Sequence, residues 1–278
     1  MKKIAVVVII FLLNIGIVFA REDIPERVIS LGPAITESLY LLGQGQKLIG
    51  VTIYCSKPAE AKAKEKIGTV REVSVEKIIS LEPDLVLATS LTDPKTVMKL
   101  RETGIKTVVF DEPKNYEQLR QQFIKLAALV GKELPAEGIL RESDARIEAV
   151  RKRFDSFIKP KVFIQIGAKP LFAATGNSLL NDFIIFSGAN NIALDAANGL
   201  YSREEVLKRN PAVILIVTMG IAADSEREAW QKYNSIDAVK NKRIYIIDSQ
   251  KVCSPTPLGF AMALEEIVVI LHPQFTGV

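Results

Sequence analysis

The residue types that most often perform covalent chemistry are sparse in this sequence. It contains two cysteines, Cys55 and Cys253, and a single histidine, His272. A Ser-His-Asp or Cys-His mechanism would have to use that one histidine, six residues from the end of the sequence. At the end of an expected helix, His272 is better suited to stabilising the helix C-terminus than to binding haem or a metal. Hydrolytic nucleophile chemistry is therefore not expected.

The two cysteines leave three possibilities open. Each is expected in a loop that follows a strand, so both could lie at the same edge of the molecule. Export would permit a disulfide between Cys55 and Cys253 if their Cα atoms lay within about 7 Å. They could instead be free buried thiols, or supply a thiolate to a metal centre. Because no CxxC pair is present, a zinc-ribbon site is excluded, and we predict neither a metal site nor a cofactor.

Two glutamates, Glu76 and Glu204, occupy equivalent positions in an internal repeat. The stretch Val73–Leu87 matches Tyr201–Leu215 at a constant offset of 128 residues. Each copy combines an N-capping serine, a two-turn helix, a proline that ends the helix and a buried strand. Two such copies predict two lobes of similar architecture.

Two interpretations of these glutamates remain open at this point. A carboxylate in the first turn of a helix interacts favourably with the helix dipole, by about 0.3–1 kcal/mol. Alternatively, Glu76 and Glu204 are exposed carboxylates that meet arginines of a partner protein on both sides of a cleft. Exposed ion pairs contribute little energy individually, but two that are far apart fix orientation and accelerate encounter.

One long helix, Ala136 to Ile158, is predicted between the two copies. Leu140 and Ile147 belong to an apolar stripe at helical spacing, and charged residues fill the other faces. Pro135 suits its start and Pro160 stops it. At about 1.5 Å per residue the helix would span roughly 34 Å, enough to join two lobes rigidly. The alternative is a surface helix inside one larger domain.

Strand and helix patterns alternate on both sides of this helix. The fold class is therefore predicted to be α/β, with two Rossmann-like lobes, mainly parallel sheets and a ligand cleft between the lobes. The expected strands are Arg27–Leu31, Lys47–Thr52, Asp84–Ala88, Lys106–Phe110, Lys161–Gly167, Leu171–Ala174, Ala212–Val217 and Arg243–Ile247. The predicted domains are a signal peptide (1–20), an N-terminal lobe (21–135), the connecting helix (136–159) and a C-terminal lobe (160–278).

The N-terminal segment has the features of a secretory signal. Lys2 and Lys3 precede the apolar run Ile4–Val18, and Val18–Ala20 is a small-x-small cleavage site. A retained anchor is the alternative, although the run is shorter than the about 20 residues that span a bilayer. Cleavage after Ala20 would release an exported, soluble chain with 34 basic and 32 acidic residues. This balance argues against nucleic-acid binding.

Ligands of parallel α/β lobes bind beyond the carboxyl ends of the strands. Tyr54, Tyr201 and Met219 could supply apolar walls there, although plain packing is the alternative for each. Gly176 precedes a helix N-terminus with free N–H groups, and Arg71 could face an anionic ligand. The candidate ligand-binding residues are Pro33, Tyr54, Cys55, Arg71, Thr89, Gly176, Tyr201, Met219 and Ser254.

An ordered set of motifs resembles a known family. The motifs are RVISLGPAITESLYLLG, GVTIYCSKPAEA, IGTVREVSVEKIISLEPDLVLA, ATGNSLLNDFIIFSGANNIA, SREEVLKRNPAVILI and SIDAVKNKRIYIID. They are similar to the helical-backbone periplasmic binding proteins of ABC importers, the receptors for cobalamin, ferric siderophores and haem. The resemblance covers roughly Arg27 to Pro273. The opening SLGPAITE and the following GVT-x-YC-x-x-P are closest to the cobalamin-binding branch.

The resemblance implies a shallow cleft between two lobes, little closure on binding, and one permease-docking glutamate on each lobe. Those roles fall on Glu76 and Glu204, and the loops of Pro33 and Tyr54 would line the cleft. The sequence departs from the cobalamin receptors in one respect. Its only tryptophan, Trp230, belongs to a segment placed away from the cleft, whereas those receptors tend to line the cleft with several aromatics.

The predicted function is therefore an exported, monomeric, non-enzymatic receptor that hands a corrinoid to an ABC permease dimer. A ferric siderophore is the first alternative, for which Arg71 and Lys57 are the candidate cleft cations. Haem is the second, with Tyr54 or Tyr201 as iron ligand. From other classes, an extracytoplasmic enzyme acting on a tetrapyrrole or metal chelate, or a sensor domain, would fit the same two-lobed plan.

Overall fold

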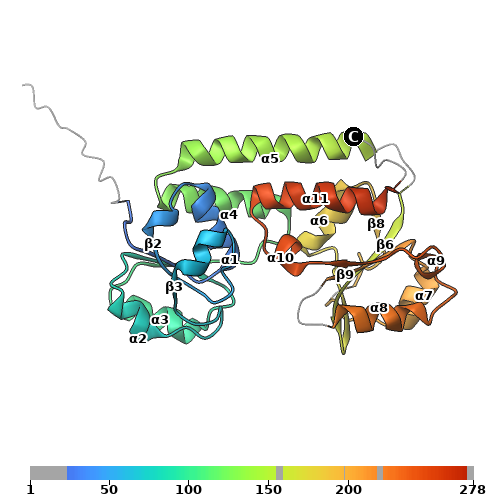
Figure 1. The fold of residues 1–278 in the computed structure, drawn as a ribbon, viewed down its shortest axis with the longest axis horizontal. Helices are drawn as coiled ribbons and strands as arrows, with labels where there is room; N and C mark the ends of the chain where they lie inside the picture. The colour runs from blue at the N-terminus through green and yellow to red at the C-terminus, as the bar shows by residue number, and fades with distance from the viewer. Residues whose placement is uncertain (1–23, 155–158, 197, 218–221, 274–278) are drawn as a thin grey trace, which may run out of the picture.

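The computed structural model describes residues 24–154, 159–196, 198–217 and 222–273. Two α/β lobes lie side by side and are connected along one side by α5 (Glu133–Phe154) (Figure 1). The predicted signal peptide, Met219 and the last four residues of the predicted long helix fall outside the described residues.

The N-terminal lobe is built on a five-stranded, wholly parallel sheet with the order β3-β2-β1-β4-β5. Its strands are β1 (Val28–Ser30), β2 (Leu48–Val51), β3 (Glu65–Lys66), β4 (Leu85–Thr89) and β5 (Thr107–Phe110). Its helices are α1 (Pro33–Leu41), α2 (Val75–Ser80), α3 (Pro94–Glu102) and α4 (Tyr116–Leu129), with 3-10 turns η1 (Gly45–Lys47) and η2 (Ala59–Ala63). The four strands predicted for this lobe are confirmed.

The C-terminal lobe has the order β10-β9-β6-β7, with β8 also paired to β6. Its strands are β6 (Lys161–Ala168), β7 (Leu171–Ala173), β8 (Asn190–Asn191), β9 (Val213–Val217) and β10 (Ile244–Ile247). Its helices are α6 (Leu179–Phe186), α7 (Arg203–Arg209), α8 (Ala223–Gln231), α9 (Asp237–Lys240), α10 (Ser249–Val252) and α11 (Pro257–Leu271). Among the named strands of the described residues, only β7 runs antiparallel to its neighbour, so the prediction of mainly parallel sheets is confirmed.

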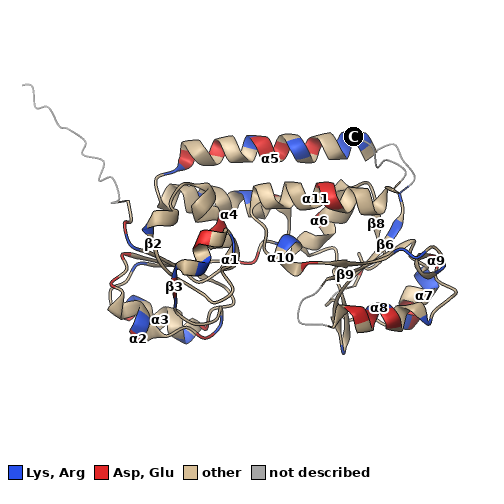
Figure 2. Cartoon of the chain, in the orientation of Figure 1, with Lys and Arg blue, Asp and Glu red and all other residues tan. Residues whose placement is uncertain are grey.

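The connecting helix α5 starts earlier than predicted. It begins at Glu133, whereas the sequence pattern placed the start at Ala136. Pro135 lies in the first turn, where the backbone N–H groups have no intrahelical partner, so its missing N–H removes no bond. Leu140 and Ile147 form part of the buried face, as the apolar stripe predicts, and basic and acidic residues are interspersed along the helix (Figure 2).

The internal repeat is confirmed in the backbone. Ser74 and Ser202 cap α2 and α7, each accepting a hydrogen bond from the backbone N–H three residues later. Both helices then reach a residue in the left-handed region, Glu82 at φ 46° and Asn210 at φ 48°. These residues directly precede the two prolines of the repeat and lie at the same offset of 128.

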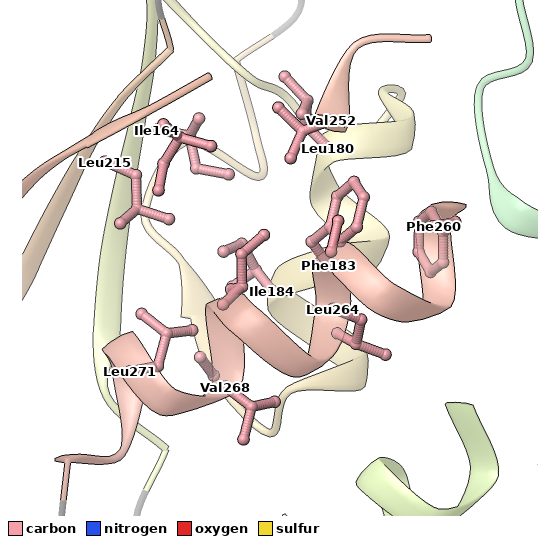
Figure 3. Packing of buried hydrophobic residues seen from close by; sticks show 14 of the residues in the cluster. Ile164, Leu180, Phe183, Ile184, Leu215, Val252, Phe260, Leu264, Val268 and Leu271 are labelled. Atoms are coloured by element: carbon pink, nitrogen blue, oxygen red, sulfur yellow. The ribbon is translucent and has the colours of Figure 1, made fainter. Parts of the chain in front are cut away.

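The largest hydrophobic cluster extends beyond one lobe. Its centre lies between α6 and α11, where the rings of Phe183 and Phe260 stack at 4.1 Å between centroids (Figure 3). The same cluster includes Tyr116 of α4 and Phe154 of α5. The lobes therefore share a packed core beneath the connecting helix. Within the described residues, no helix is long and apolar enough to span a bilayer.

Candidate functional site

A cleft of about 390 Å³ lies between the lobes, at the carboxyl ends of β1, β2 and β10. This is the position that parallel α/β lobes favour for ligands. The N-terminal lobe contributes Pro33, Glu37, Ile53, Tyr54, Ser56 and Lys57, and the C-terminal lobe contributes Ser249, Gln250, Cys253 and Ser254. Of the predicted ligand-binding residues, the structure brings Pro33, Tyr54 and Ser254 together here.

Tyr54 and Ile53 provide the apolar wall of the cleft. Their exposed fractions are 56% and 52%, high values for large hydrophobic side chains. The neighbouring Cys55 points the other way and is buried, with Thr36 Oγ1 and Thr52 Oγ1 lying 3.1 and 3.2 Å from its Sγ. The turn after β2 therefore holds Tyr54 in the cleft by fixing Cys55 in the core.

Among the described residues that line the cleft, the charged side chains are those of Glu37 and Lys57. Burial raises the pKa of Glu37 above its ordinary value, and the charge of Lys57 partly offsets this rise in pKa. Within the described part of the chain, neither side chain forms an ion pair shorter than 4 Å. Together with the serine hydroxyls and the Gln250 amide, they give a polar surface of low net charge.

Cys253 lines the cleft as a neutral thiol. Burial, together with the charges of Glu112 and Asp248, raises the pKa of its thiol to about 12. Cys55 and Cys253 are both free, so the structure favours free thiols among the three alternatives. The described residues contain no group of three or more His, Cys, Asp or Glu side chains that could hold a metal ion.

Four other predicted ligand-binding residues lie away from this cleft lining. Tyr201 is half-buried, and its hydroxyl donates to the Ile192 carbonyl at 3.1 Å. Gly176 donates its N–H to the Leu194 carbonyl at 3.3 Å. The remaining two are Thr89, at the end of β4, and Arg71, exposed in the loop before α2.

His272 and Trp230 also lie away from the cleft. His272 is buried, with its Nε2 2.7 Å from the Ser187 carbonyl and its ring stacked 4.4 Å from that of Phe154. Trp230 is fully buried in the C-terminal lobe. The only tryptophan therefore packs in the core, as the resemblance implies.

Sequence reasoning missed Glu37 and Gln250 as cleft residues. Glu37 had a usable signal, because it stands four residues after Pro33 on α1 and so shares its face of the helix. The signal for Gln250 was weaker, because α10 is a four-residue helix, too short for a periodic sequence pattern to predict.

Glu76 and Glu204 are exposed near the N-termini of α2 and α7. These helices lie on the side of the molecule opposite α5, one on each lobe (Figure 1). Each glutamate's pKa is lowered, first by its own backbone N–H. Lys99 is the next cause for Glu76, and the Ser202 hydroxyl is the next for Glu204.

Comparison with known proteins places this architecture in a family. The sequence model described as Periplasmic binding protein matches residues 28–251. The chain belongs to that family.

Curated relatives indicate the family's role in transport. An uncharacterized ABC transporter substrate-binding lipoprotein of Bacillus subtilis is 28% identical over 260 residues, covering 90% of this chain and 81% of the relative. A vitamin B12-binding protein of Yersinia pseudotuberculosis is 30% identical over 233 residues, covering 83% and 81%.

Solved structures agree with the fold. A possible iron-binding, periplasmic solute-binding protein from Staphylococcus epidermidis has a TM-score of 0.81 at 26% identity, covering 90% of this chain and 100% of that one. The periplasmic heme-binding protein RhuT from Roseiflexus has a TM-score of 0.79 at 25% identity, covering 89% and 98%. The chain is thus a substrate-binding protein of an ABC transporter and not an enzyme. Substrate-binding proteins of this kind work with a permease and an ATPase.

Proposed function

We propose that the protein is exported to the periplasm, loses its signal peptide after Ala20, and acts as a monomeric receptor for a metal chelate. Its preferred ligand is a corrinoid such as cobalamin, which it delivers to its permease dimer. The same proposal includes the domain boundaries predicted above: a signal peptide (1–20), an N-terminal lobe (21–135), the connecting helix (136–159) and a C-terminal lobe (160–278). Similarity to proteins described as binding vitamin B12, iron and heme supports a metal chelate as the ligand class.

The charge balance of the cleft is the observation that carries the choice of a corrinoid. A corrinoid is a broad macrocycle edged with uncharged amide groups, whereas haem bears two propionates and most ferric siderophores are anionic. The carboxylate of Glu37 disfavours an anionic ligand, whereas Lys57 favours one. Hydroxyls and the Gln250 amide can instead exchange hydrogen bonds with amides, while Tyr54 packs on the macrocycle.

Haem is the second candidate, because the exposed Tyr54 hydroxyl could bind ferric iron from within the cleft. The Tyr201 hydroxyl is less suited, since it already donates to Ile192. A ferric siderophore ranks third. Of its two candidate cations, Lys57 lines the cleft and Arg71 does not.

The ligand class is tested by titrating the purified mature protein, in separate experiments, with cyanocobalamin, haemin and ferric enterobactin. Binding is followed by absorbance and calorimetry. We expect saturable 1:1 binding of cyanocobalamin at micromolar concentration or tighter, and at least tenfold weaker binding of the other two. Tighter binding of haemin or of the siderophore would replace the corrinoid by that class.

Glu76 and Glu204 are proposed to dock on arginines of the permease. Their exposure on both lobes and their lowered pKa values support this role, because both carboxylates are ionised at neutral pH. The double variant E76K/E204K should abolish uptake and leave ligand affinity unchanged. An equal loss of ligand binding would mean that the glutamates do not act through the permease.

A further inference from the structure

Arg203 directly precedes the proposed docking residue Glu204, yet its side chain contacts α8. Its Nη2 donates to Glu226 Oε2 at 2.7 Å. Its guanidinium lies over the Trp230 ring, 4.3 Å from the ring centroid. Arg203 is half-buried and Glu226 is buried, so this ion pair is largely removed from solvent.

Glu226 is itself held rigidly from the other side. Gln165 Nε2 donates to the same carboxylate oxygen, Oε2, at 2.7 Å. Gln165 Oε1 in turn accepts from Trp230 Nε1 at 2.6 Å, and both of these side chains are fully buried. The network therefore connects β6, α8 and α7 and leaves the Glu226 carboxylate little freedom to turn away from Arg203.

The other lobe shows that the repeated unit does not require this ion pair. At the offset of 128, the residue equivalent to Arg203 is Val75, which is buried in the N-terminal lobe. A buried ion pair is often no more stabilising than apolar side chains of similar volume. Fold stability alone therefore does not account for the Arg203–Glu226 pair.

The two exposed glutamates also differ in their nearest cation. Glu76 Oε1 lies 3.4 Å from Lys99 Nζ, in an exposed ion pair. Within the described residues, Glu204 has no ion pair of this kind. The guanidinium closest in sequence, Arg203, is the one engaged by Glu226.

We propose that Glu226 holds Arg203 against α8 and out of ion-pair range of Glu204, so that Glu204 presents a carboxylate that Arg203 compensates only weakly to a basic partner surface. Glu226 and Arg203 are thus positioning residues, and their effect on docking rests on the docking role proposed above. An anion whose nearest cation is paired with another acid projects its field further into solvent, which speeds encounter with a basic surface. Glu204 would accordingly contribute more to docking than Glu76, whose charge Lys99 partly neutralises.

The first test needs no partner. The carboxyl pKa of Glu204 is measured by NMR in the wild type, in E226Q and in the double variant R203V/E226Q, which places valine where the other lobe has Val75. Loss of its anion frees Arg203 to approach Glu204, so the pKa of Glu204 should fall in E226Q. In the double variant the Arg203 guanidinium is gone, and with it the lowering that its charge exerts on Glu204, so the pKa of Glu204 should rise above the wild-type value.

The second test measures docking on the protein's own permease–ATPase complex in nanodiscs. E226Q should weaken binding by roughly two- to fivefold, the range expected for one exposed ion pair, and R203V/E226Q should restore it. Cyanocobalamin affinity should be unchanged throughout. The matched control is D224N, which removes one acid from the same helix without touching Arg203.

A purely structural role predicts a different pattern, in which the double variant docks as weakly as E226Q or worse. That pattern, or a Glu204 pKa that does not respond to E226Q, would overturn the inference. Failure of the docking proposal is separately recognisable. In that case E204K leaves docking intact, while the NMR titration still decides whether Glu226 sequesters Arg203.

Discussion

Tyr54 and Cys55 are neighbours whose environments could not be separated from sequence. The pattern placed both in the loop after a strand, and both were candidates for the ligand site. Thr36 and Thr52 decide the outcome by holding the Cys55 sulfur in the core, and α1, which carries Thr36, is distant in sequence. Side-chain direction in such a loop depends on contacts that no local pattern contains.

The two tyrosines proposed for the ligand give a matched pair of variants. Tyr54→Ala removes an exposed aromatic ring from the cleft and should lower cyanocobalamin affinity at least tenfold. Tyr201→Phe removes only a hydroxyl bonded to Ile192, and should cost about 0.5–1.5 kcal/mol of unfolding free energy without changing affinity. Calorimetric titration and denaturant unfolding of both variants check this. A loss of affinity confined to Tyr201→Phe would contradict the assignment of the cleft.

His272 predicts a pH dependence of stability. Burial, and secondarily the charge of Arg243, lowers its pKa below the ordinary value of 6.5, while the Ser187 carbonyl acts in the opposite direction. A base whose pKa is lowered by folding binds its proton more readily in the unfolded chain. Its contribution to stability is therefore complete above pH 6.5 and is lost as the pH falls through the lowered pKa.

Denaturant unfolding between pH 7.5 and 5 should show this loss, and His272→Phe should flatten that part of the profile. Carboxylates titrate in the same way in both proteins, so the difference between the two profiles isolates the histidine. Identical slopes in the two proteins would mean that His272 does not titrate within this range.

Elements with a strong local signal were predicted nearly to the residue. The strand expected at Lys106–Phe110 is β5, Thr107–Phe110, and the one expected at Leu171–Ala174 is β7, Leu171–Ala173. The start of α5 was missed because the proline that marked it is tolerated throughout the first turn. Thr89 was assigned to the cleft because it follows a strand end, and Gly176 because it precedes a helix N-terminus. The twist of each sheet decides which strand ends face the other lobe, and that requires three-dimensional packing.

The repeated helix–turn–strand unit allows a prediction at two equivalent turns. Glu82 and Asn210 both adopt the left-handed backbone, which costs an ordinary L-residue about 1–2 kcal/mol. Glu82→Gly should therefore raise the unfolding free energy by about 1 kcal/mol, after allowing for the greater freedom of glycine in the unfolded chain. Chemical denaturation measures the difference.

Asn210→Gly is the matched control, with the opposite expected sign. Asparagine tolerates this conformation, and the Asn210 side chain exchanges hydrogen bonds of 2.8 and 2.9 Å with Asp237. Losing them should outweigh any relief of backbone strain. If both variants shift stability in the same direction, the two turns are not distinguished by these contacts.

At the scale of the whole molecule, noncovalent contacts join the two lobes in addition to the connecting helix α5. Asp182 of α6 accepts from the Tyr116 backbone N–H of α4 at 2.7 Å. Arg146 of α5 makes a two-pronged pair with Glu265 of α11, at 2.9 and 2.8 Å. Together with the hydrophobic cluster beneath α5, these bonds oppose a large hinge motion.

Ligand binding should accordingly change the shape of the molecule little. Small-angle scattering of the mature protein, alone and saturated with cyanocobalamin, should give the same radius of gyration within experimental error. The variant R146A/E265A, which removes the two-pronged pair, provides a loosened comparison. A clear contraction of the wild type on binding would show that the lobes move as separate bodies.

The protein is proposed to hold one ligand between its two lobes without transforming it. Hydrogen–deuterium exchange with and without cyanocobalamin tests it most directly. We expect slower exchange in Ile53–Lys57 and Ser249–Ser254, one segment from each lobe, with exchange in α2 and α7 unchanged. Protection confined to a single lobe, or located outside this cleft, would contradict it.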